Sequence, residues 1–288
     1  MKESFKDRLF QSIITLILCI FGFVALVPLI SVVAMSLSSK TAADMNIVNL
    51  WPVGFTLDSW KYILSDNALW RAFFVSLFST IVGTILALCI TSLLAYPLSK
   101  TDFRMGRYVM LMIVITMIFK APVVPYFLTL RTLGLVNNPL VLVLPHILTA
   151  YNLAIMRTFF KQFPGEVEEA AKIDGCGYFQ ILCRIILPSS KAILATVGLF
   201  YAVTMWNQFQ HPMMFITNPK FFPLQLKIRQ LIGGGSELSS ITMLSKANYS
   251  ESTLSSAAVV FALIPIVVVY PWLQKYFAKG AMLGSVKG

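Results

Sequence analysis

The sequence predicts an all-α membrane protein whose chain crosses the bilayer six times. Hydrophobic residues make up 57% of the 288 residues, and the mean hydropathy is +0.78. Charged residues account for only 12%, whereas a soluble domain usually carries about 25%. Apolar runs of about 20 residues, the length that spans a bilayer as a helix, recur along the chain. These three observations together favour a polytopic helical protein.

The six expected spans form one transmembrane domain over residues 1–288. They cover residues 11–37, 70–98, 108–130, 139–160, 190–209 and 255–276. The first is too long for a signal peptide and is expected to be retained. The fourth begins at Pro139, which suits the first turn of a helix. Three connections are long, namely 38–69, 161–189 and 210–254.

The distribution of Lys and Arg predicts the orientation. With the N-terminus inside, 14 of these 23 cations fall in inner segments, eight fall in outer segments, and Lys120 lies in the third span. Cytoplasmic loops carry such an excess, so both termini are expected in the cytoplasm. Residues 161–189 then form a cytoplasmic loop, and residues 210–254 form an extracytoplasmic loop. The net charge of +11 has the same origin, and nucleic-acid binding is not expected.

The carboxylates separate two classes of transporter. All 12 lie outside the six expected spans. Ion-coupled carriers usually need acids within the membrane, so a secondary transporter is the alternative that this distribution disfavours. Cys176 and Cys183 are seven positions apart, which does not suit a metal pair, and no metal site is expected.

One third of the acids gather in a single short segment of the 161–189 loop. They are Glu166, Glu168, Glu169 and Asp174. Acids complement a helix N-terminus, and Pro164 suits its first turn. Gly175 permits a sharp turn at the other end. Two interpretations remain open on these features alone: a solvated connector, or a surface that another protein approaches closely.

The spacing in this loop resembles a known motif. Glu169-Ala170-Ala171, two residues, Asp174-Gly175, nine residues and Ile185-x-Leu187-Pro188 follow the EAA loop of ABC-importer permeases. Residues 134–147, the pair Trp206-Asn207 and the tail 279–288 are similar to the smaller permease of maltose-type carbohydrate importers. The branch that handles oligosaccharides, some of them acidic, is the most similar.

The resemblance implies a fold, partners and site residues. The fold is that of type I ABC-importer permeases in a bacterial inner membrane. The coupling residues are Glu168, Glu169, Ala170, Ala171, Asp174 and Gly175. The implied partners are a second, homologous permease, a homodimeric ATPase, an extracytoplasmic solute-binding protein, an oligosaccharide and membrane lipid. No P-loop sequence is present, so ATP and Mg²⁺ are expected on the ATPase and no cofactor on this chain.

Candidate residues of the substrate path are fewer. Lys120 in the third span either snorkels to the interface or faces the path, where it would favour an acidic sugar such as a uronate oligomer. Trp206 and Asn207 offer a ring face and an amide to a carbohydrate, and Tyr201 is a weaker candidate. Most aromatic residues in spans, however, serve packing.

Two glycine-containing segments have open roles. Gly233, Gly234, Gly235 and Ser236 form either a flexible linker or, as the resemblance implies, a contact with the solute-binding protein. The tail 275–288 carries three lysines and is either a free terminus or, by the same resemblance, a segment near the ATPase dimer.

Overall fold

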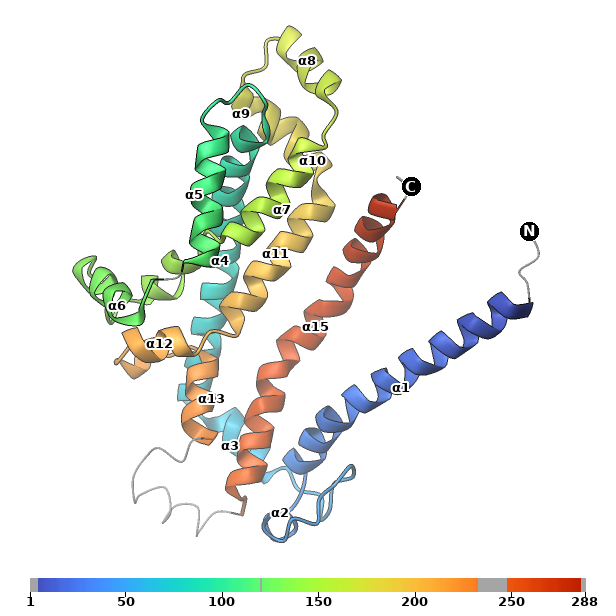
Figure 1. Cartoon of the computed structure of the whole chain (residues 1–288). Coiled ribbons are helices and arrows are strands. Elements are labelled where there is room, and N and C mark those ends of the chain that lie inside the picture. Colours follow the sequence, from blue (N-terminus) through green and yellow to red (C-terminus); the bar gives the residue numbers. More distant parts are fainter. Residues whose placement is uncertain (1–4, 120, 233–247, 286–288) are drawn as a thin grey trace. The chain divides into compact units, whose positions relative to one another are not determined.

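The computed structural model describes the backbone of residues 5–119, 121–232 and 248–285, and in these ranges all regular structure is helical (Figure 1). Side chains are described for residues 9–119, 121–232 and 248–271. Within this part of the chain, three helices are long and apolar enough to cross a membrane. Three bent pairs of helices raise that number to as many as six if each pair forms one span. The predicted all-α, six-span fold class agrees with this architecture.

Three spans are long helices. They are α1 (Phe5–Ser36), α4 (Asn67–Ser99) and α15 (Glu251–Ser285). The apolar surface of α1 is open, and residues such as Phe21 and Phe23 are 70% and 67% exposed. A helix that exposes apolar side chains on all sides is stable in lipid or against partner helices, not in water.

The third expected span is two helices. α5 (Gly106–Ile118) ends before a short connection, and α6 (Val123–Thr132) begins after Pro122. Proline lacks an N–H and disfavours helical geometry in the residue before it, which explains why the chain leaves the helix here.

The fourth expected span is also broken. Its first part consists of two 3₁₀ turns, η1 (Pro139–Leu142) and η2 (Leu144–His146). The helix α7 (Ala150–Lys161) follows, with its axis bent by 46° from the first part. Pro145 cannot donate to the helical ladder, and the Thr149 hydroxyl accepts a hydrogen bond from the Asn152 N–H as a new cap.

The loop after α7 contains the candidate site. It holds α8 (Gly165–Ile173), followed by α9 (Tyr178–Ile181), a π-helical turn η3 (Leu182–Ile186) and α10 (Leu187–Ser189). α11 (Lys191–Trp206) then departs at 86° from this segment and provides the fifth span. α12 (Gln210–Phe215), η4 (Pro219–Phe221) and α13 (Leu224–Ile232) complete the order before α15.

The chain divides into two compact units. The first unit comprises the chain up to Trp70 and Ile228–Ile264, with the short helices α2 (Lys40–Asp44) and α3 (Asp58–Ser65). Within it, the Ser59 hydroxyl donates to Thr253 Oγ1 at 2.9 Å, and the Trp70 ring meets Phe261 edge-on.

The second unit comprises Arg71–Lys227 and the chain from Pro265. Its core is built from α4, α7, α9, η3 and α11. The buried side chains of this core include Ala95, Met156, Ile181, Val197 and Tyr201. The helix α8, which contains the candidate site, packs against this core through Ala171, which belongs to the same cluster of buried residues.

Candidate functional site

The helix α8 has well-defined ends. Glu166 and Glu168 lie in its first turn, where carboxylates interact favourably with the helix dipole. At its other end Gly175 adopts a φ of +82°, a left-handed conformation that favours glycine. The Cys176 N–H donates to the Ala171 carbonyl and the Gly175 N–H to the Lys172 carbonyl. These two bonds form a Schellman motif, so the glycine in the loop sequence has a definite structural task.

The two faces of α8 differ in exposure. Glu168 and Ala171, three positions apart, are buried at 5% and 6% exposure. Glu169, Ala170 and Asp174 are exposed. Residues three apart lie on one helix face, so α8 packs on the core through Glu168 and Ala171. The face that carries Glu169, Ala170 and Asp174 remains open.

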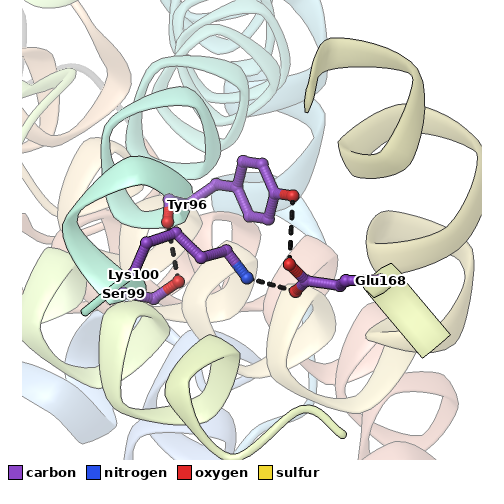
Figure 2. Close-up of polar contacts among 4 residues, drawn as sticks. All are labelled: Tyr96, Ser99, Lys100 and Glu168. Atoms are coloured by element: carbon purple, nitrogen blue, oxygen red, sulfur yellow. Dashed lines mark hydrogen bonds and ion pairs between the residues drawn. The ribbon is translucent and has the colours of Figure 1, made fainter. Parts of the chain in front are cut away.

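Glu168 forms an ionic clamp with the carboxyl end of α4, made of Tyr96, Lys100 and Glu168 (Figure 2). The Lys100 ammonium donates to Glu168 Oε1, and the Tyr96 hydroxyl donates to Oε2 at 3.5 Å. The Lys100 ammonium also lies 4.5 Å from the centroid of the Tyr96 ring. Both oxygens of the carboxylate thus have donors, which a buried charge requires.

The last turn of α4 is held by neighbouring side chains. The Ser99 hydroxyl donates to the Tyr96 carbonyl at 2.6 Å, as Figure 2 shows. From α7, Arg157 Nε donates to the Leu98 carbonyl at 2.7 Å. Terminal carbonyls of a helix need such donors, and cations complement the negative end of its dipole. Tyr96 and Lys100 of the clamp are therefore attached to a helix end that hydrogen bonds hold in place.

The relatives of this chain support one family assignment. Residues 87–282 match the family described as binding-protein-dependent transport system inner membrane component. The chain belongs to this family. It is therefore a permease component of an ABC transporter and a multi-pass protein of the inner membrane, and the resemblance seen in the EAA loop is confirmed.

Two proteins are similar to the permease over nearly their whole length. It is 38% identical over 285 residues to the polygalacturonan/rhamnogalacturonan transport system permease protein YtcP of Bacillus subtilis (strain 168). This alignment covers 98% of the chain and 100% of the relative. Protein LplC of the same organism is 37% identical over 293 residues, which cover 100% of the chain and 98% of LplC.

A solved structure is similar as well. It is described as a bacterial ABC transporter involved in the import of the acidic polysaccharide alginate. One of its chains superimposes with a TM-score of 0.88 at 32% identity, covering 96% of the permease and 99% of that chain. This likeness confirms the type I permease fold predicted from the sequence.

The candidate path residues of α11 lie in different settings. Tyr201 is 1% exposed, and its hydroxyl bonds Thr91 Oγ1 at 2.7 Å and accepts from the Thr149 N–H at 3.2 Å. The structure thus leaves Tyr201 no open face for a sugar and gives it a role in joining α4 and α7 to α11. A sequence cannot show which way a tyrosine points on a helix that is apolar on nearly all sides.

Trp206 and Asn207 lie at the end of α11. Trp206 is 5% exposed and meets the Phe73 ring edge-on, and within the described residues its Nε1 has no hydrogen-bond partner. Asn207 is exposed, and its amide donates to the Val203 carbonyl at 3.0 Å. Lys120 and Gly233–Ser236 lie outside the described residues, so their expected roles stay predictions.

A second polar group, not expected from the sequence, lies among α6, η2 and α12. This histidine cluster consists of Tyr126, His146, His211 and Phe215. The two imidazole centroids are 4.9 Å apart, and the Tyr126 hydroxyl is 2.8 Å from His211 Nε2. Burial and the nearby His146 lower the pKa of His211 to about 4, so its ring is neutral at pH 7. No motif signals this cluster, because Tyr126, His146 and His211 are 20 to 85 positions apart in the chain.

Proposed function

We propose that the permease forms half of the pathway of an ATP-driven importer for acidic oligosaccharides. Two nearly full-length likenesses carry this proposal: one relative is named for polygalacturonan and rhamnogalacturonan transport, and one solved structure is described as importing alginate. Polygalacturonan and alginate are both polymers of uronate sugars, which carry a carboxylate on each unit. Uronate oligomers are accordingly the substrate class that we assign.

The complete importer requires three partners. One six-helix permease encloses half a pathway, so a second, homologous permease completes it. A homodimeric ATPase holds ATP and Mg²⁺, and an extracytoplasmic binding protein delivers the sugar. In this arrangement ATP binding closes the ATPase dimer and opens the pathway outward, and hydrolysis resets it inward. The permease chain transmits motion and catalyses no reaction.

We infer that α8 receives the motion of the ATPase through its open face. Glu169 and Asp174 offer charges, Ala170 permits a close approach, and Ile173, which is 87% exposed, offers an apolar anchor. Glu168 and Ala171 support this face from behind rather than contact the partner. Both termini and α8 then lie in the cytoplasm.

Uptake by the reconstituted complex tests the substrate class. Proteoliposomes that contain both permeases and the ATPase are supplied with the binding protein and either trigalacturonate or maltotriose, which match in length. We expect ATP-dependent uptake of the uronate trimer and at least tenfold less of the neutral trimer. Preferential uptake of maltotriose would contradict the assignment.

Charge reversal on α8 tests the coupling surface. Glu169→Lys should abolish most of the substrate-stimulated ATPase activity while the complex still folds, because the open face then repels basic groups of the partner. Asp44→Lys reverses an exposed acid on α2 and serves as the matched control. A Glu169→Lys complex with normal stimulated activity would show that another surface couples the two subunits.

A further inference from the structure

A pocket of about 310 Å³ lies where α4, α5 and α7 come together beside the ionic clamp. Five cations line it: Lys100, Arg104, Arg107, Arg157 and Lys161. The positive-inside tendency explains why cations lie on this side of the membrane, but it does not require them to converge on one hollow.

The charges in this pocket are only partly compensated. Lys100 pairs with Glu168, and Arg157 donates through Nε to a backbone carbonyl. Within the described ranges, Arg104, Arg107 and Lys161 form no ion pair. Asp102 is nearby in the chain, but it is exposed, and its carboxylate accepts a hydrogen bond from the Thr101 hydroxyl rather than from a cation of the pocket in the part of the chain that the structure describes. The pocket thus retains positive charge, which a bound anion would balance.

An apolar surface continues from the pocket along α5. Leu111, Val114 and Ile118, which follow the pocket residue Arg107 at four, seven and eleven positions, are 58%, 41% and 72% exposed. Their spacing of three and four positions puts them on one side of the helix. Cations at the start of α5 followed by an open apolar stripe match an amphiphile with an anionic head and hydrocarbon tails.

We propose that this pocket binds the phosphate headgroup of an anionic phospholipid, whose acyl chains lie along α5. One guanidinium group can donate two parallel hydrogen bonds to two oxygens of a phosphate. Basic pockets between membrane-spanning helices on the cytoplasmic side bind the headgroups of anionic lipids. The apolar stripe favours a lipid over free phosphate, which has no tails, and over an acidic protein segment. Lys100 belongs to both sites, so the headgroup sits next to the clamp that holds α8.

Native mass spectrometry of the purified complex tests this site, with phosphatidylglycerol as the probe and phosphatidylcholine as the neutral reference. The double variant Arg104→Gln/Arg107→Gln should lower the affinity for phosphatidylglycerol on the order of tenfold. Arg184→Gln/Lys191→Gln is the matched control, because it removes two exposed cations from the same side of the membrane without touching the pocket. The control should retain the lipid as the unaltered complex does.

Two further measurements distinguish the other occupants. Inorganic phosphate at millimolar concentration should not displace phosphatidylglycerol, and a photoreactive phosphatidylglycerol should label residues 103–112. Displacement by phosphate would identify a phosphate site and overturn the lipid assignment. Equal lipid affinity in both double variants would also overturn it, as would loss of the ATPase from the Arg104→Gln/Arg107→Gln complex with lipid binding unchanged.

Discussion

The ionic clamp and the histidine cluster solve the same problem, polar groups away from water, by opposite means. At the clamp, an ammonium and a phenol each donate a hydrogen bond to one oxygen of a buried carboxylate. In the histidine cluster, His211 is neutral at pH 7; its ring meets the His146 ring edge-on and lies tilted against Phe215. Separating the clamp would leave a buried charge without its partner, whereas movement in the histidine cluster would cost only ring contacts and one hydrogen bond. The difference suits a clamp beneath α8, which is proposed to carry force.

Breaking the clamp should have the largest effect. Lys100→Met leaves the Glu168 side chain, 7% exposed, without its cation and should destabilise the complex by about 3 kcal/mol. The melting temperature and the ratio of substrate-stimulated to basal ATPase activity should both fall.

A reciprocal exchange and a surface control sharpen this prediction. Lys100→Glu combined with Glu168→Lys restores an ion pair of reversed polarity and should recover coupling. Lys61→Met breaks an exposed pair with Asp58 and should cost less than about 1 kcal/mol. If Lys100→Met behaved like Lys61→Met, the clamp would have no special role.

Two glycines provide a comparison with equal backbone strain. Gly175 after α8 and Gly134 after α6 have φ values of +82° and +69°, and a Cβ at either position would meet nothing within 4 Å. Alanine at either site should therefore destabilise the chain by about 1 kcal/mol. Only Gly175→Ala should lower substrate-stimulated ATPase activity several-fold. Equal activity losses in both variants would mean that strain alone, and not the position of α8, affects coupling.

The histidine cluster should respond to acid. The pKa of folded His211 lies near 4, below the value of about 6.5 in an unfolded chain. The unfolded chain thus binds a proton first, and the stabilisation present above pH 6.5 is lost as the pH falls toward 4. His211→Gln should flatten this part of the melting-temperature profile.

The hydroxyl of the cluster has a separate and smaller effect. Tyr126→Phe removes the bond to His211 Nε2 and should lower stability by about 1 kcal/mol at pH 7. Its pH dependence should remain, because the ring is still buried beside His146. A profile as flat as that of His211→Gln would assign the acid response to the tyrosine instead.

The smallest expected effect concerns the charge at Lys120. Lys120→Gln should slow uptake of a uronate oligomer more than uptake of any neutral sugar that the importer accepts, since it removes a cation and keeps hydrogen-bond donors. Initial uptake rates of the two sugars in one vesicle preparation provide the measurement. Equal slowing of both would return Lys120 to an interfacial or packing role.

The local features of α8 could be predicted from its own residues. Pro164 and the early acids indicate where the helix begins, and Gly175 indicates where it ends, since these signals act within one helical turn. The inward turn of Glu168 was not predictable in this way. Its partner Lys100 lies 68 positions away, and four acids within nine positions look equivalent in a sequence.

The spans show the same limit. Apolar runs mark where a chain enters the membrane, but they do not show which prolines end a helix. Pro28 and Pro97 lie inside continuous helices, whereas the chain leaves the helix before Pro122 and forms 3₁₀ turns around Pro145. Likewise, the hydroxyl of the buried Tyr201 forms its hydrogen bond with Thr91, which lies 110 positions away in the chain. A pattern within one helix carries no information about such a partner.

The burial of Glu168 beside the open Glu169 has a consequence for ionic strength. The Debye length is about 10 Å at 0.1 M salt and about 3 Å at 1 M, and screening acts mainly on charges that solvent reaches. Added salt should therefore weaken the proposed contact of Glu169 with the ATPase and leave the pair of Glu168 and Lys100 intact. Two neighbouring acids of one short helix thus respond to the medium in different ways, so concentrated salt should release the ATPase from a permease whose α8 is still in place.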